Sequence, residues 1–171
     1  MKRLFVFLFA LLLAGVAAAQ QPDYPNIKNF LRHDKDFCTG GQPRMEDLAK
    51  MKEEGLKAVL NLRRDSEYDA AEEEATIKKL GLKYFRVPVD GADPKDEQAD
   101  EVLRILADKD NRPLFFHCTI ANRVGAFWLI YRVLKDGWSV EKADEEARKV
   151  GLHSENLKKF ALDYIARHQK K

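Results

Sequence analysis

The stretch between residues 114 and 135 restricts the possible folds of this chain more than any other. Leu114–His117 is a short apolar run that ends in a single polar residue, as expected for a strand buried inside a sheet. Residues 123–135 are again strongly apolar, but over the length of a helix. A buried strand followed directly by a buried helix is typical of α/β proteins, in which helices cover a mostly parallel sheet.

The rest of the chain alternates in the same way. Further strands are expected at residues 37–40, 58–62 and 84–89, and further helices at residues 43–54, 69–80, 139–149 and 154–168. Asp93 followed by Pro94 indicates the N-cap and first residue of one more helix. The sequence therefore predicts a three-layer α/β domain with a four- or five-stranded, mostly parallel sheet flanked by helices. In such sheets, sites lie beyond the carboxyl ends of the strands.

The N-terminus has the layout of a secretory signal peptide. Lys2 and Arg3 precede an apolar run over residues 4–16, and three alanines follow at residues 17–19. Residues 1–19 are expected to be removed, which leaves a single periplasmic or secreted domain over residues 20–171. The apolar run is shorter than the roughly 20 residues of a membrane-spanning helix, so no stable membrane anchor is expected after cleavage.

The charge balance argues against nucleic acid as a partner. The chain carries 30 basic and 28 acidic side chains, and two of the basic ones belong to the expected signal peptide. The remainder is formally neutral, whereas nucleic-acid-binding domains usually show a basic excess or stripe. His153 and His168 have no partners at ligand spacing, so no zinc site is predicted.

The segment between the buried strand and the buried helix carries the candidate chemistry. It contains Cys118 and Arg123, separated by Thr119, Ile120, Ala121 and Asn122. A loop at a helix N-terminus presents unpaired backbone N–H groups that bind anions, and a guanidinium fork matches two phosphate oxygens. The same positive environment favours the thiolate of a cysteine. One loop would therefore both supply a nucleophile and bind an oxyanion.

These residues resemble those of a known family. His117-Cys118, a short loop and then Arg123-x-Gly125 resemble the signature loop of tyrosine and dual-specificity phosphatases. Residues 39–43 (Thr-Gly-Gly-Gln-Pro), 58–63 (Ala-Val-Leu-Asn-Leu-Arg) and 87–89 (Val-Pro-Val) are similar to the phosphatase-like domain of bacterial β-lactamase-hydrolase-like proteins. The resemblance extends over residues 27–165.

The resemblance implies a role for each matching residue. Cys118 would attack phosphorus and form a phosphocysteine, while Arg123 and the backbone of residues 119–123 would hold the phosphate oxygens. His117 would orient the loop and help to maintain the thiolate. A carboxylic acid in the loop after the preceding strand would protonate the leaving oxygen and then activate water. We favour Asp90 for this role over Asp93, which is the expected helix cap. The family requires no metal and no organic cofactor.

Three departures from the family pattern bear on activity. Four residues separate Cys118 from Arg123 instead of the usual five, a spacing that also occurs in rhodanese sulfurtransferases. The usual loop glycine is absent, and Asn122 is expected to supply the left-handed backbone. Val124 replaces the usual hydroxyl residue, and we therefore expect slow breakdown of a phosphocysteine.

Two residues outside the loop have open assignments. Cys38 precedes a turn at the same end of the sheet as Cys118, and the oxidising compartment that export implies suggests a reversible disulfide between them. A small buried cysteine is the simpler alternative. Arg63 follows a strand, and a surface position is its simplest interpretation.

Two other functions stay open beside phosphate monoester hydrolysis. A sulfurtransferase would hold a persulfide on Cys118, and a non-catalytic module would only bind phosphate or a phosphorylated ligand. The substrate class is equally open, with a phosphorylated small molecule, an envelope component or a phosphoprotein as candidates.

Overall fold

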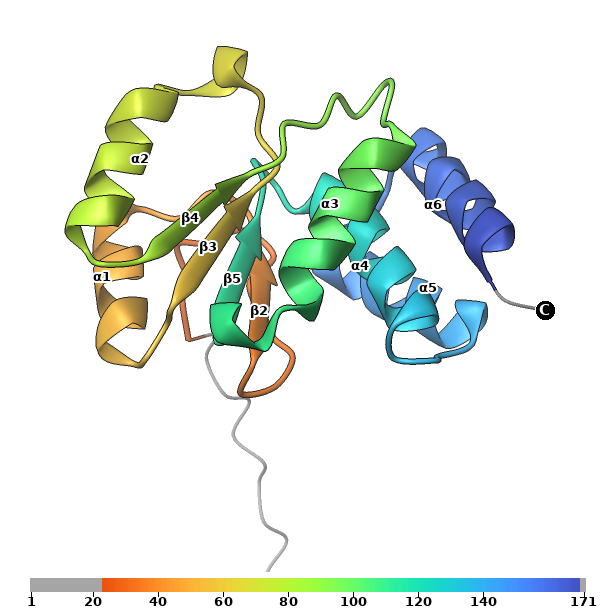
Figure 1. The fold of residues 1–171 in the computed structure, drawn as a ribbon, viewed down its shortest axis with the longest axis horizontal. Coiled ribbons are helices and arrows are strands. Elements are labelled where there is room, and N and C mark those ends of the chain that lie inside the picture. Colours follow the sequence, from red (N-terminus) through yellow and green to blue (C-terminus); the bar gives the residue numbers. More distant parts are fainter. Residues whose placement is uncertain (1–22, 170–171) are drawn as a thin grey trace, which may run out of the picture.

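The computed structural model describes residues 23–169 and places a five-stranded sheet between two layers of helices (Figure 1). The strand order is β1-β2-β5-β3-β4, and every neighbouring pair is parallel except β1 with β2. The strands are β1 (Leu31–Arg32), β2 (Phe37–Gly40), β3 (Ala58–Asn61), β4 (Lys83–Arg86) and β5 (Leu114–His117). The predicted three-layer α/β fold with a mostly parallel sheet is confirmed.

The described chain also contains six α-helices and two short 3-10 turns, and α4, α5 and α6 follow the last strand. The helices are α1 (Met45–Glu53), α2 (Ala70–Lys79), α3 (Asp96–Ala107), α4 (Asn122–Leu134), α5 (Val140–Val150) and α6 (Glu155–His168), and the turns are η1 (Asp65–Glu67) and η2 (Lys109–Asn111). Figure 1 shows α1 and α2 on one side of the sheet and α3 to α6 on the other. No helix in residues 23–169 is both long and apolar enough to span a bilayer.

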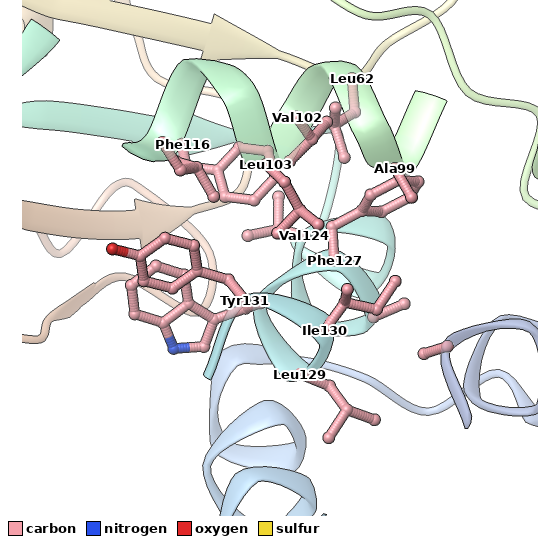
Figure 2. Packing of buried hydrophobic residues seen from close by; sticks show 14 of the residues in the cluster. Leu62, Ala99, Val102, Leu103, Phe116, Val124, Phe127, Leu129, Ile130 and Tyr131 are labelled. Carbon is pink, nitrogen blue, oxygen red and sulfur yellow. The ribbon is translucent and has the colours of Figure 1, made fainter. Parts of the chain in front are cut away.

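The larger core lies between the sheet and helices α3 to α6 (Figure 2). Alternate strand residues such as Leu60 and Phe116 point into it, because successive side chains of a strand face opposite sides. Helix α4 is buried along nearly its whole length, and Gly125 lets α5 pack closely against it. A Cβ at Gly125 would come within 2.8 Å of the Ala147 carbonyl oxygen. The apolar segment that most restricted the fold is therefore the centre of this core.

The smaller core lies on the opposite face of the sheet, under α1 and α2. It contains Val59 and Phe115, the strand residues that alternate with those of the larger core. Leu48 of α1 and Ile77 of α2 close it from outside. Side chains from neighbouring positions of one strand therefore lie in different cores. Polar groups at such positions are likewise kept on opposite faces of the sheet.

The helix expected to begin at Asp93 starts later, and this prediction is wrong. The N-cap of α3 is Lys95, whose backbone N–H donates to Gln98 Oε1 at 2.9 Å. Asp93 instead belongs to a turn, where its N–H donates to the Asp90 carbonyl at 3.1 Å. Asp93 therefore closes the turn that begins at Asp90, and the helix starts only after Lys95. The expected signal peptide at residues 1–19 lies outside the described residues.

Candidate active site

The candidate site lies at the carboxyl ends of β3 and β5, around the loop that joins β5 to α4. We call residues 118–123 the phosphate loop. Cys118 and Arg123 lie at its two ends, and both line a cavity of about 430 Å³. Thr119, Ile120 and Asn122 of the same loop also line the cavity. The other lining residues come from the loop after β3, the loop after β4, and the start of α6 with its N-cap: Arg64, Glu67, Asp90, Gly91, Ala92, Ser154 and Leu157. The position agrees with the general rule for parallel sheets.

The phosphate loop turns through a left-handed residue just before α4. That residue is Ala121, with φ of 67°, so the expectation that Asn122 would take this conformation is wrong. Asn122 is instead the first residue of α4, and its Oδ1 accepts the backbone N–H groups of His153 and Ser154 at 3.0 and 3.2 Å. This side chain is therefore used to tie the phosphate loop to the segment between α5 and α6.

Two segments from the N-terminal half support the phosphate loop from the other side. Asn29 Nδ2 donates to the Ile120 carbonyl at 3.0 Å, and the Gln42 N–H donates to the Thr119 carbonyl at 3.2 Å. Gly41 leaves room for this approach, since a Cβ there would lie 2.9 Å from the Thr119 carbonyl oxygen. The Thr-Gly-Gly-Gln-Pro segment thus braces the loop that carries the candidate nucleophile.

Arg123 is anchored to the ends of two other backbone segments. Its Nη1 donates to the carbonyl oxygens of Leu62 and Val89 at 3.1 and 3.0 Å. The guanidinium also forms a bidentate pair with Glu67, with Nη1–Oε1 and Nη2–Oε2 distances of 2.7 and 2.6 Å. The hydrogen bonds from Arg123 hold the pKa of the Glu67 carboxyl well below its usual range. Glu67 is therefore an ionised carboxylate on the group expected to bind phosphate.

Asp90 lies on the cavity wall, and Asp93 is not among the lining residues. The Oδ2 of Asp90 accepts from Arg64 Nη1 at 2.8 Å, and its Oδ1 accepts from the Ala92 N–H at 3.0 Å. Asp93 is exposed and pairs with Lys95. Of the two predicted acids, the structure thus brings only Asp90 to the same cavity as Cys118.

The segment that carries Asp90 is held by the last helix. Asn156 Nδ2 donates to the carbonyl oxygens of Gly91 and Ala92 at 3.0 and 3.2 Å. Gly91 also packs near Leu157 and the Arg123 side chain. Asn156 therefore connects α6 to the acid loop (residues 90–93), a contact that no local sequence pattern predicts.

His117 points away from the cavity, into the smaller core. Its side chain is fully buried, and neither ring nitrogen has a hydrogen-bond partner among the described residues. Burial, together with the nearby Arg63 charge, lowers the pKa of His117 to about 3. At neutral pH the imidazole is therefore uncharged, so it contributes no positive charge to a thiolate at Cys118. Its role in orienting the phosphate loop stays a prediction.

Arg63 is buried, and the expectation of a surface position is wrong. Its guanidinium pairs with Glu73 at 3.1 Å, and its Cζ lies 3.8 Å from the centre of the Tyr68 ring. Both members of the ion pair are less than a tenth exposed. Because Arg63 lies on the α1 and α2 side of the sheet, it is not part of the cavity that Cys118 lines.

The two cysteines do not form the disulfide that was considered. Both thiols are free, and they lie in separate cores on opposite faces of the sheet. Cys38 pairs in register with Phe115, three positions before Cys118. Burial raises the pKa of the Cys38 thiol to about 12. The simpler alternative, a small buried cysteine, describes Cys38.

Glu67 is the site residue that sequence reasoning missed. It lies in the polar stretch after β3, where the only signal was its place beyond the carboxyl end of a parallel strand. The described residues contain no group of three or more His, Cys, Asp or Glu side chains arranged to hold a metal ion.

Comparison with known proteins places this chain in a family. Residues 17–163 match a family model described as a DSP-PTPase phosphatase fused to NAD+ kinase. The dual specificity protein phosphatase TpbA of Pseudomonas aeruginosa is 25% identical over 159 residues, which cover 89% of this chain and 70% of that protein.

Solved structures show the same fold. A putative phosphatase from Shewanella putrefaciens has a TM-score of 0.71 at 21% identity and covers 85% of this chain and 97% of its own. The core catalytic domain of the PP-IP phosphatase SIW14 from S. cerevisiae has a TM-score of 0.70 at 23% identity, covering 81% of this chain and 86% of its own. The chain therefore belongs to the DSP-PTPase phosphatase family and, with it, to the superfamily of cysteine-dependent phosphatases.

Proposed function

We propose that this protein hydrolyses phosphate monoesters through a phosphocysteine on Cys118. The observation that carries the proposal is the shared cavity: Cys118, Arg123 and Asp90 come from three separate segments and line the same space. The phosphate loop precedes the N-terminus of α4, where unpaired backbone N–H groups favour an anion. A thiol, a guanidinium and a carboxyl group around one anion site are the groups that such a displacement needs.

In the first step, the Cys118 thiolate forms a bond to phosphorus as the ester P–O bond breaks. Arg123 and the N–H groups of the phosphate loop hold the three remaining oxygens. The departing oxygen takes a proton from Asp90, which has to be released from Arg64 to act as an acid. The products of this step are the free alcohol and the phosphocysteine.

In the second step, water attacks phosphorus while Asp90 accepts its proton, and the S–P bond breaks to restore the thiolate. Val124, which follows Arg123, is fully buried in the larger core and labelled there in Figure 2. A valine side chain cannot donate a hydrogen bond to the departing sulfur. We therefore infer that breakdown of the phosphocysteine limits the overall rate.

The test is hydrolysis of p-nitrophenyl phosphate by reduced protein beside Cys118→Ser, with rapid-quench mass spectrometry for a phosphorylated Cys118. We expect phosphate release that is lost in the variant, with a burst of p-nitrophenol before the steady state. Absence of hydrolysis at every pH between about 5 and 8 would contradict the proposal.

The same assay separates the two alternatives. Thiocyanate formation from thiosulfate and cyanide, without phosphate release, would indicate a sulfurtransferase with a persulfide on Cys118. A trapped phosphocysteine without turnover, or phosphate binding alone, would indicate a module that binds phosphate. The acid Asp90 on the cavity wall favours hydrolysis over both, since neither alternative needs a proton donor there.

Three classes of substrate are compatible with this proposal: a phosphorylated small molecule, an envelope component or a phosphoprotein. P. aeruginosa TpbA has been crystallised with phosphotyrosine, and that structure covers 89% of this chain with a TM-score of 0.66 at 22% identity. Phosphotyrosine is therefore the first natural phosphoester to test. A kcat/KM no higher than for p-nitrophenyl phosphate would point away from phosphotyrosine proteins.

We further propose that the protein acts outside the cytoplasm, on the basis of Lys2, Arg3 and the apolar run over residues 4–16. Expression of the full chain in a Gram-negative host, followed by fractionation and intact-mass measurement, tests this directly. A periplasmic species shortened by residues 1–19 is expected, and a full-length cytoplasmic species would contradict export.

A further inference from the structure

The guanidinium of Arg123 has no free hydrogen at its two terminal nitrogens. Each terminal nitrogen of arginine carries two N–H groups, and here they face five acceptors. Nη1 donates to the carbonyl oxygens of Leu62 and Val89 and to Glu67, and Nη2 donates to Glu67 and to the Thr119 hydroxyl at 3.1 Å. A phosphate group that uses the terminal nitrogens must therefore displace one of these acceptors.

Glu67 is the acceptor that can leave. The carbonyl oxygens of Leu62 and Val89 belong to backbone that is itself hydrogen-bonded between β3 and the segment after β4. The Glu67 carboxylate, by contrast, is on a side chain that lines the cavity. It also accepts a hydrogen bond from the Thr119 hydroxyl at 2.7 Å, so it already occupies a position between the phosphate loop and Arg123.

A partner for the displaced carboxylate is already in place. Arg64 Nε lies 3.4 Å from Glu67 Oε1, and the Arg64 backbone N–H donates to the same oxygen at 2.9 Å. The Arg64 side chain is about half exposed, which leaves it free to follow. Loss of Arg123 therefore does not leave the Glu67 charge without a counter-ion.

Resting on the proposed function, we propose that Glu67 acts as an internal competitor of the substrate phosphate for Arg123. It holds the guanidinium in the free enzyme and has to be displaced for an oxyanion to bind. Since displacement costs the same whether the oxyanion is substrate or product, Glu67 weakens both, and it favours release of inorganic phosphate. It is a positioning residue that sets oxyanion affinity, and the chemical step does not use it.

The change in phosphate affinity of Glu67→Gln has opposite signs if Glu67 competes with phosphate and if it only supports Arg123. If Glu67 competes with phosphate, Glu67→Gln removes the competing charge and phosphate binds more tightly. If Glu67 only supports Arg123 in a productive orientation, the same change weakens phosphate binding and lowers kcat. Gln keeps the size of the side chain, and Arg123 keeps its two backbone partners, so the variant is expected to fold.

The experiment is calorimetric titration of wild type, Glu67→Gln and Glu46→Gln with inorganic phosphate at low ionic strength. Glu46→Gln is the matched control, because it removes the same charge from an exposed position in the first turn of α1. We expect the Kd for phosphate to fall by roughly tenfold in Glu67→Gln and to stay unchanged in Glu46→Gln. KM for p-nitrophenyl phosphate should fall by a similar factor, with kcat unchanged, because breakdown of the phosphocysteine and not release of phosphate limits the rate.

Binding is measured without turnover, which separates this inference from the proposed function. An unchanged or larger Kd in Glu67→Gln overturns the inference alone, provided that wild type binds phosphate. If neither protein binds phosphate, the inference is overturned, while the proposed phosphatase activity is decided by the hydrolysis assay.

Discussion

Two arginine–glutamate pairs lie on opposite faces of the same sheet and differ in how accessible they are to a ligand. Arg63–Glu73 is enclosed under α1 and α2, with side chains 6% and 7% exposed, whereas Arg123–Glu67 borders the cavity, with side chains 12% and 21% exposed. Both pairs use the same charges at similar distances. The difference between them therefore depends on their surroundings.

The enclosed pair is completed by neutral donors. Glu73 accepts from Asn61 Nδ2 and the Tyr84 hydroxyl at 2.7 Å each, and from Gln42 Nε2 at 3.0 Å. Gln42 also accepts from Arg63, so that both charges of the pair have side-chain partners around them. Each pair borders a cavity, of about 290 Å³ for the enclosed pair and about 430 Å³ for the open pair, but only the open pair has a thiol beside it. An ion pair becomes a binding site when an external anion can reach it and replace one partner.

The largest expected effect is on activity at the open pair. Arg123→Lys replaces a planar fork by a point charge and removes donors to the phosphate oxygens, so kcat/KM for p-nitrophenyl phosphate should fall by about 10²–10³-fold. The thermal midpoint should change little, because the pair is partly exposed. Activity within tenfold of wild type would show that the backbone N–H groups alone hold the phosphate.

Asp90→Asn should give the next largest effect, and its size should depend on the leaving group. Without a proton donor, hydrolysis of phenyl phosphate should slow by about 10²-fold, while hydrolysis of 2,4-dinitrophenyl phosphate, whose leaving group needs no proton, should change little. Asn156→Ala, which loosens the acid loop, should show the same pattern more weakly. Equal losses with both substrates would exclude Asp90 as the acid.

Arg63→Met should affect stability and spare the site. Removing one member of a buried pair leaves the other charge uncompensated, which typically costs about 3–5 kcal/mol. The neutral donors around Glu73 should reduce the loss in free energy of unfolding to about 3 kcal/mol, measured by urea unfolding. Activity per folded molecule should stay within a few-fold of wild type. A large loss of kcat with normal stability would mean that the enclosed pair communicates with the cavity.

Much of the fold followed from local patterns. The strands Ala58–Asn61 and Leu114–His117 coincide with short apolar runs that begin after Lys57 and Pro113, and such runs indicate burial. Strand β1 was not expected, because two residues are too few to carry a periodicity. The predicted start of α3 is wrong because Asp93-Pro94 satisfies the rules for a helix start, while Asp93 closes a turn with Asp90 and the helix is capped at Lys95 by Gln98.

The residues themselves predict the site where neighbours in sequence are neighbours in space, and Asp90 was named only through the family resemblance. Cys118 and Arg123 share one loop, so their spacing carried the information. Glu67 reaches Arg123 across 56 positions of the chain, and Arg64 reaches Asp90 across 26. Such contacts depend on which strand ends meet, which a local pattern does not record. Likewise, Arg63 and Arg64 are adjacent in sequence, but Arg63 is buried beside Glu73 and Arg64 is half exposed beside Asp90. No local pattern distinguishes the two arginines.

The smallest expected effect concerns His117, which lies beside the enclosed pair with Nε2 4.0 Å from Glu73 Oε1. The folded pKa of about 3 is below the ordinary value of 6.5. Between these values the unfolded chain binds a proton that the folded protein excludes. The free energy of unfolding should therefore fall as the pH falls from about 6.5, by at most about 1.4 kcal/mol per pH unit from this group.

The informative window for His117 lies between about pH 6.5 and pH 4.5. Below this window Glu146 also contributes. Burial raises the pKa of its carboxyl, but the hydrogen bonds with His33 and Arg132 outweigh burial and lower the pKa from 4.5 to about 2. The stabilisation from Glu146 therefore declines as the pH falls from about 4.5 towards 2. Urea unfolding of wild type, His117→Gln and the exposed control His153→Gln at several pH values isolates the effect. His117→Gln should flatten the pH dependence in this window, and His153→Gln should not. Equal slopes in all three proteins would mean that His117 accepts a proton in the folded state, with Glu73 as its partner.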